Sequence, residues 1–157
     1  MSLDRIPTPA GSLWLCALRD VAPDPDAVIA SVGAEVVVCL NQRRELEQRA
    51  PAYLEWVESA GDRVVWFPVA NFEAESAGST LPVLEPIIDR LRAGGSVLVH
   101  CAYGQGRAGT MAVCILLVLG VPLGEALRAV AEHRIHAGPG SSSQWALVED
   151  VARSVAR

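Results

Sequence analysis

Apolar runs alternate with amphipathic stretches along the whole chain. Short apolar runs at 11–17, 35–40, 63–67 and 96–99 are typical of buried strands. Longer amphipathic or apolar stretches at 23–32, 45–60, 81–93, 108–119, 123–134 and 144–156 predict helices. Strands that alternate with helices favour an α/β fold of three layers, in which helices flank a mostly parallel central sheet.

Capping and breaking residues set several boundaries. Ser79 or Thr80 is the expected N-cap of the helix at 81–93, because Pro82 is suited to a first helical turn. Pro51 falls inside the helix predicted at 45–60 and is a candidate interruption. Residues 68–80 are expected to form a loop. In parallel sheets ligands bind at the carboxyl ends of strands, so the loops after Leu40, Pro68 and the 96–99 strand are expected to converge.

Length and composition predict one domain over residues 1–157. The chain has 51% hydrophobic and 20% charged residues, which suits a globular fold. We find no apolar run long enough to span a membrane and no signal peptide. A net charge of −5 argues against a nucleic-acid partner. The four cysteines lack the spacing of metal ligands, so we expect no metal, no cofactor and a cytoplasmic location.

The most informative segment is the glycine-rich stretch from His100 to Thr110, which connects a predicted strand to a predicted helix. Such a turn can direct successive backbone N–H groups to one point at a helix N-terminus, which forms an anion site. Arg107 adds a planar fork for two oxygens, and positive surroundings favour the thiolate of Cys101. The expected anion-binding residues between them are Ala102, Tyr103, Gly104, Gln105 and Gly106.

Two other interpretations of this segment compete with an anion site. Cys101 could be a buried structural thiol, but that leaves the glycines and Arg107 unexplained. Gly104, Gly106 and Gly109 also spell the G-x-G-x-x-G of dinucleotide-binding folds, with Glu125 at a suitable distance for a ribose. That pattern normally follows the first strand of its domain, whereas several elements precede it here.

The segment resembles the H-C-x5-R signature of the cysteine-dependent protein phosphatases, in particular their dual-specificity branch. The resemblance implies a phosphotyrosine protein phosphatase-like fold and hydrolysis of phosphate monoesters without a metal. It implies that Cys101 attacks phosphorus and forms a phosphocysteine, while Arg107 and the loop N–H groups hold the phosphoryl oxygens. The implied substrates are a phosphorylated protein, on tyrosine, serine or threonine, or a small phosphorylated molecule.

The resemblance extends beyond the loop. Gly11-Ser-Leu-Trp-Leu matches the family's first strand, and Val37 to Leu40 followed by Glu45 matches a strand and its acidic loop. Phe67-Pro68-Val69-Ala70 matches the segment that ends in the family's general-acid aspartate.

Two departures affect catalysis rather than anion binding. Asn71 stands where the aspartate belongs, and Ala108 stands where a serine or threonine usually contacts the cysteine sulfur. Glu73 or Glu75 could replace the acid, whereas Thr110 is expected to point to a different side of its helix. Three alternatives therefore stay open: a slow enzyme, an enzyme with a displaced acid, or a phosphate-binding pseudophosphatase used as a recognition module.

Four further residues have competing interpretations. His100 is expected to fix the loop through its ring hydrogen bonds, as the family's histidine does. Arg134 could face the site or lie at a solvated helix end. Gln144 could position a water, as in related phosphatases, but a surface position is favoured. A thiol relay would require Cys39 to reach Cys101.

Overall fold

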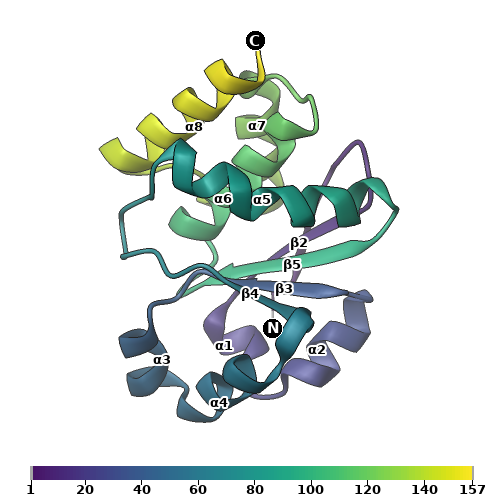
Figure 1. Cartoon of the computed structure of the whole chain (residues 1–157), viewed down its shortest axis with the longest axis vertical. Helices are drawn as coiled ribbons and strands as arrows, with labels where there is room; N and C mark the ends of the chain where they lie inside the picture. The colour runs from purple at the N-terminus through teal and green to yellow at the C-terminus, as the bar shows by residue number, and fades with distance from the viewer. Residues whose placement is uncertain (1, 157) are drawn as a thin grey trace.

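A five-stranded sheet separates two layers of helices in the computed structural model, which describes residues 2–156 (Figure 1). The strands are β1 (Asp4–Ile6), β2 (Ser12–Ala17), β3 (Val36–Cys39), β4 (Val64–Trp66) and β5 (Ser96–Cys101). Their order is β1-β2-β5-β3-β4, and only the pair of β1 and β2 is antiparallel. The predicted three-layer α/β fold with a mostly parallel sheet is confirmed.

Helices cover both faces of the sheet (Figure 1). One layer holds α1 (Leu18–Val21), α2 (Pro25–Val32), α3 (Arg43–Arg49) and α4 (Pro51–Ser59), followed by a 3₁₀ turn at Gly61–Arg63. The other layer holds α5 (Ala77–Arg92), α6 (Gly106–Val118), α7 (Leu123–His133) and α8 (Ser142–Val155). Two separate apolar cores result, one on each side of the sheet.

Strand register places the loop between β5 and α6 at the carboxyl edge of the sheet. Central strand β5 lies between β2 and β3, where Ala17 is opposite Cys101 and Cys39 is opposite His100. Side chains alternate along a strand, so neighbouring residues face opposite layers. Cys101 accordingly belongs to the core under α5 and α6, while Cys39 belongs to the core under α3 and α4.

Several predicted boundaries are wrong. Helix α5 begins at Ala77 rather than Leu81, because the hydroxyl of Ser76 caps it by accepting the N–H of Ser79. The helix then continues through Pro82, which is not in its first turn. Strand β1 precedes the predicted first strand, and the last helix begins at Ser142 rather than Gln144.

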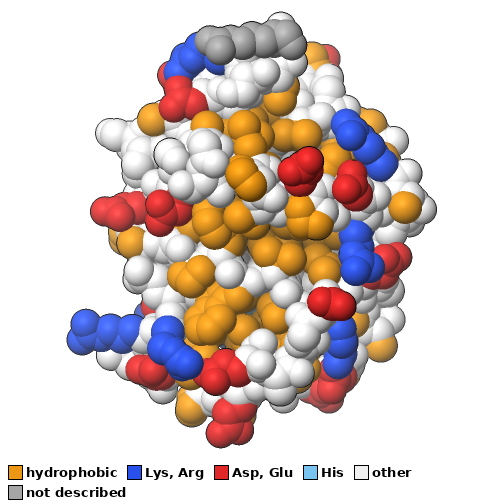
Figure 2. All heavy atoms as spheres, viewed as in Figure 1, with side chains coloured by type: hydrophobic (Ala, Val, Ile, Leu, Met, Phe, Trp, Pro, Cys, Tyr) orange, Lys and Arg blue, Asp and Glu red, His pale blue; other side chains and the backbone are white. Residues whose placement is uncertain are grey.

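The interruption at Pro51 is observed: α3 ends at Arg49 and α4 begins at Pro51, the helical position that tolerates proline best. On the face seen in Figure 2, apolar side chains remain visible across the middle of the molecule, where α5 crosses it, with charged groups at the margins. Within residues 2–156 no helix is long and apolar enough to cross a membrane.

Candidate active site

The carbonyl groups of the loop between β5 and α6 are all held by the surrounding structure. The carbonyl of Ala102 accepts the N–H of Leu18, and that of Gln105 accepts the N–H groups of Gly109 and Gly138. Between them, the carbonyls of Tyr103 and Gly104 accept two N–H groups of the Arg134 side chain. In a trans peptide unit the C=O and the N–H of the next residue point in opposite directions. Because the carbonyl groups are held from outside the loop, the N–H groups point to its inside.

These inward N–H groups lie in the segment where the sequence predicted an anion cradle. Among the described residues, the N–H groups of 102–105 donate no hydrogen bond. Gly106 and Arg107 open α6, where the first N–H groups of a helix lack intrahelical partners. The loop thus presents unpaired donors at a helix N-terminus, an arrangement that binds oxyanions.

Glycine is required at one position of the loop and at one position of α6, for different reasons. Gly104 has a φ of +72°, and a Cβ there would lie 2.3 Å from the carbonyl oxygen of Cys16. A Cβ on Gly109 would lie 2.2 Å from the nitrogen of Gly138, so this glycine lets α6 approach the 137–138 segment. The conformation of the loop and the packing of α6 therefore explain these glycines, and a dinucleotide site is not needed to explain them.

The guanidinium of Arg107 is fixed on two sides and open on the third. Nη1 donates to Glu45 Oε2 at 2.7 Å and to the carbonyl of Val69 at 2.8 Å, while Nη2 donates to Glu45 Oε1 at 2.7 Å. One N–H of Nη2 and the N–H of Nε are left, and Nε has no partner among the described residues. These two donors share one edge of the guanidinium, so the remaining edge can hold two oxygens of an anion.

Arg107 and Glu45 form an ion pair in which each partner favours the charged form of the other. Burial acts to raise the pKa of Glu45, but hydrogen bonds from Arg107 and from the N–H of Gln42 lower it overall. Burial likewise acts to lower the pKa of Arg107, but Glu45 and the nearby Cys101 raise it. Glu45, which the sequence placed in the family's acidic loop, thereby positions Arg107.

Arg134 faces the loop between β5 and α6, so the solvated-helix-end alternative is wrong. Its Nε donates to the carbonyl of Gly104 at 2.7 Å, and its Nη2 donates to that of Tyr103 at 2.9 Å. The side chain is 7% exposed and lies just after the end of α7. Arg134 therefore holds two of the outward carbonyls that shape the cradle.

His100 lies on the opposite face of the sheet from Cys101. Its Nε2 shares a 2.7 Å hydrogen bond with the hydroxyl of Tyr53, which sequence reasoning missed because Tyr53 occupies an ordinary apolar position of α4. Complete burial lowers the pKa of His100 to about 4, and the charge of Arg107 acts in the same direction. His100 is thus a neutral anchor beneath the strand that carries Cys101.

The burial of His100 predicts that the folded protein loses stability in acid. In the unfolded chain His100 gains its proton near pH 6.5, whereas in the folded protein it does so only near pH 4. The unfolded state is therefore favoured as the pH falls between these values. We expect His100 to reduce the free energy of unfolding by about 3 kcal/mol from pH 7 to pH 4. Urea unfolding at several pH values measures this loss.

The matched variant for that measurement is His100→Gln, which does not titrate. Its stability should fall less steeply with acid than that of the natural protein. Equal slopes, or an NMR titration of the His100 ring near pH 6.5, would contradict this account.

Asn71 lies in the loop before α5 and is exposed. Its Oδ1 accepts the N–H of Phe72, a residue with a left-handed φ of 64° and an exposed ring. The same loop is tied to the cradle by Gln144, whose Nε2 donates to the carbonyl of Glu73 at 3.3 Å. A Cβ on Gly106 would lie 3.3 Å from Gln144 Nε2, so the amide borders the cradle.

Gln144 is 2% exposed, so the favoured surface position was wrong. Its Oε1 accepts the N–H of Gly140 at 2.9 Å, and this contact holds the amide in place. The signal in the sequence was its place in the first turn of α8, shortly after the Gly138–Gly140 segment.

A small cavity lies behind Arg107. It measures about 10 Å³, enough for one water, and its walls include Glu73, Thr80 and Thr110. The hydroxyls of Thr80 and Thr110 are buried and have no partner among the described residues. Thr110 borders this cavity, as expected from its helical position, and Ala108 is buried without a hydroxyl to offer.

The structure does not place Cys39 as a partner for Cys101. Cys39 lies opposite His100 in the sheet and faces the other core, so its Cβ and that of Cys101 point to opposite faces. Burial raises the pKa of Cys39 and of Cys114 to about 12. A thiol relay to Cys101 is therefore not supported.

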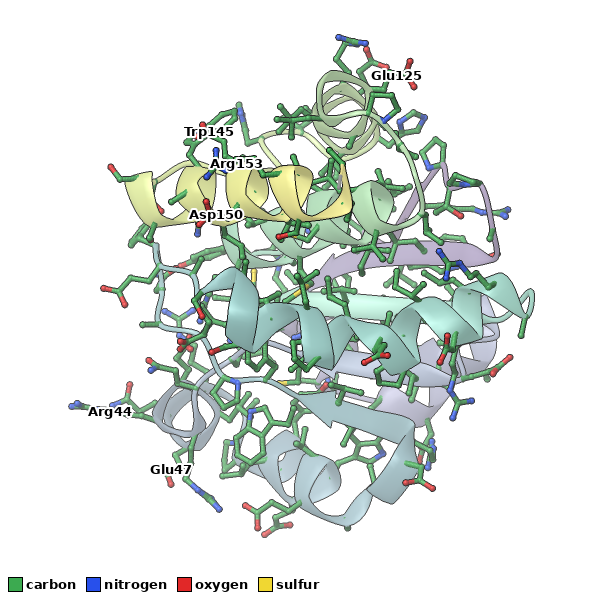
Figure 3. All side chains as sticks on the ribbon, turned by 45° about the horizontal axis from the view of Figure 1, so that its top comes forward. Arg44, Glu47, Glu125, Trp145, Asp150 and Arg153 are labelled. Carbon is green, nitrogen blue, oxygen red and sulfur yellow. The ribbon has the colours of Figure 1, made fainter. Side chains whose placement is uncertain are left out.

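Glu125, the candidate ribose partner, and two arginines of α3 lie outside the site. Arg44 extends from α3 into solvent, and Glu125 lies on α7 at the far end of the molecule (Figure 3). Arg43 donates to the carboxylate of Glu58 instead of facing an anion site.

The fold and the loop together define a cysteine-dependent phosphatase domain of the dual-specificity type. Residues 16–145 match the family PTP-SAK, described as Swiss Army Knife protein, DSP-PTPase phosphatase domain. The chain belongs to this family. No match was found among curated proteins.

Solved structures show the same architecture. Tk-PTP in its active form is 28% identical over 92% of both chains, with a TM-score of 0.71. Kinase associated phosphatase (KAP), solved with serine in place of its catalytic-site cysteine, is 20% identical over 99% of this chain and 96% of its own, with a TM-score of 0.82. Human tyrosine phosphatase-like serine/threonine/tyrosine-interacting protein is 18% identical over 99% and 98%, with a TM-score of 0.76.

Proposed function

We propose that this chain hydrolyses phosphate monoesters through a phosphocysteine intermediate. The observation that carries the proposal is the open edge of Arg107, which lies beside a loop whose N–H groups of 102–105 are unpaired. A phosphoryl group held by these donors would be in line with Cys101, which ends β5 at the start of the loop. The same donors stabilise the charge that develops on the phosphoryl oxygens in the transition state.

The reaction has two steps. In the first, the Cys101 thiolate attacks phosphorus, an S–P bond forms, and the P–O bond to the alcohol breaks. The leaving oxygen takes a proton from solvent or from a nearby acid. In the second, water attacks the phosphocysteine, which releases inorganic phosphate and restores the thiolate. The amide of Gln144 borders Gly106 and would orient that water.

Asn71 and Ala108 are expected to slow this cycle. An amide has no proton to give at neutral pH, and general-acid help is typically worth about 10² to 10⁴ in rate. Glu73 and Glu75 are the candidate substitute acids, because both border the cavity behind Arg107. The backbone of Glu73 is also held near the loop, since its carbonyl accepts a hydrogen bond from Gln144. These two departures also favour a second function: a module that binds phosphate groups with little turnover.

The substrate is a phosphorylated protein or a small phosphate ester. The loop between Cys101 and Arg107 contains no cation, so a polyphosphorylated ligand would find few extra partners in the cradle itself. The four free cysteines suit a reducing compartment, and we infer that the protein works in the cytoplasm.

Tungstate binding tests the cradle independently of turnover. Arg107→Ala is expected to weaken tungstate affinity by about 10²-fold or more, because two charge-assisted hydrogen bonds are lost. Isothermal titration calorimetry measures the affinity. Arg43→Ala, which removes an exposed arginine of α3, should leave it unchanged.

Arg107→Ala also leaves Glu45 without its partner, which costs stability. Arg107→Lys is therefore measured beside it, since lysine keeps the charge but cannot form the fork. If Arg107→Ala and Arg107→Lys both bind tungstate as tightly as the natural protein, the proposed cradle is excluded.

A further inference from the structure

The side chain of Arg134 connects the catalytic loop to the segment 2–4. Its Nη1 donates to Asp4 Oδ2 at 2.8 Å and to the carbonyl of Ser2 at 3.1 Å. Its Nε and Nη2 donate to the loop carbonyls of Gly104 and Tyr103. Nη1 also donates to Ser2 Oγ at 3.4 Å. These contacts join two segments that lie about a hundred residues apart in the sequence.

Asp4 is itself held in a fixed place. It belongs to β1 and lies opposite Leu15 of β2 in the antiparallel pair. The carboxyl end of β2 carries the carbonyl of Cys16, against which Gly104 packs closely. The loop at Gly104 is therefore confined between β2 on one side and Arg134 on the other.

Open space adjoins this contact. A cavity of about 480 Å³ borders Arg134, Tyr103 and Asp4. The guanidinium has room to turn into this cavity if nothing holds its Nη1. The carboxylate of Asp4 supplies a charged acceptor that keeps Nη1 on the side of the loop.

We propose that Asp4 is a positioning residue for the catalytic loop, acting through Arg134. Asp4 orients the guanidinium, the guanidinium fixes the carbonyls of Tyr103 and Gly104, and the fixed carbonyls turn the loop N–H groups to the anion. This inference rests on the proposed function for its catalytic consequence, but its structural part concerns anion binding alone. It also follows that Arg134 is committed to internal acceptors and is not a free cation for a second phosphate.

Asp4→Asn tests the inference, because the amide keeps the shape and removes the charge. Tungstate affinity and kcat/KM for p-nitrophenyl phosphate are each expected to fall about tenfold, the effect of one lost charge-assisted hydrogen bond. Asp4→Glu should recover part of the loss. Asp26→Asn is the matched control, since it breaks an exposed ion pair with Arg63 far from the loop and should change neither quantity.

A double-mutant cycle that combines Asp4→Asn with Arg134→Lys completes the test. If Asp4 acts through Arg134, the double variant should be no weaker in tungstate binding than Arg134→Lys alone. Additive losses, or natural tungstate affinity in Asp4→Asn, would overturn the inference. Tungstate binding without any turnover in the natural protein would count against the proposed function, while the affinity cycle would still decide the role of Asp4.

Discussion

Cys101→Ser is expected to abolish the turnover of p-nitrophenyl phosphate, with a loss on the order of 10⁴-fold or more. The serine hydroxyl is a much weaker nucleophile than a thiolate. The cradle itself is built from backbone N–H groups and Arg107, so tungstate affinity should stay within about threefold of the natural value. Steady-state kinetics and calorimetry on the same preparation measure both.

Cys114→Ala is the control for that experiment. Cys114 lies in α6 and is fully buried, so its loss affects packing and not the cradle. Turnover that survives in Cys101→Ser and not in Cys114→Ala would assign the chemistry to another group. Loss of tungstate binding in a folded Cys101→Ser protein would show that the sulfur shapes the anion site.

Asn71→Asp is expected to raise the rate on poor leaving groups by up to about 10²-fold. A phosphoserine peptide releases an alkoxide that needs a proton, whereas p-nitrophenol leaves without one, so the gain should be larger for the peptide. The local turn should survive, because an aspartate Oδ1 can accept the N–H of Phe72 as Asn71 does. Release of inorganic phosphate from both substrates measures the difference.

Two further variants show which step and which acid determine the effect of Asn71→Asp. Ala108→Thr combined with Asn71→Asp should exceed Asn71→Asp alone if slow hydrolysis of the phosphocysteine limits the rate. Glu73→Gln should have little effect if no glutamate substitutes for the acid. If Glu73→Gln removes activity while Asn71→Asp adds none, the acid is Glu73 and the assignment of Asn71 is wrong.

The position of the glycine-rich loop between β5 and α6 was predictable because its signals are local. Cys101 and Arg107 are six positions apart on one strand, loop and helix, and glycines mark where the backbone approaches its neighbours. The alternation of apolar and amphipathic segments was likewise enough to predict the layers of the fold. The predicted start of helix α5 was about one turn too late. Pro82 suggested that the first turn begins at Leu81, whereas Ser76 caps the helix and Ala77 is its first residue.

The supports of the loop were not predictable from local pattern. Arg134 contacts Asp4 and Gly104, which lie far from it in the sequence and meet it only through the order of the sheet. Strand β1 has only three residues and exists because it pairs with β2. Gln144 looked like a surface residue because its two partners, Gly140 and Glu73, are brought to it by the fold.

The most direct test of a phosphocysteine mechanism is to trap the intermediate. The protein is mixed with p-nitrophenyl phosphate, quenched in acid within milliseconds to seconds, digested and examined by mass spectrometry. We expect one phosphoryl group on the peptide that contains Cys101, and none on that peptide in Cys101→Ser. Steady turnover with no phosphorylated Cys101 peptide, and an unchanged rate in Cys101→Ser, would contradict the mechanism.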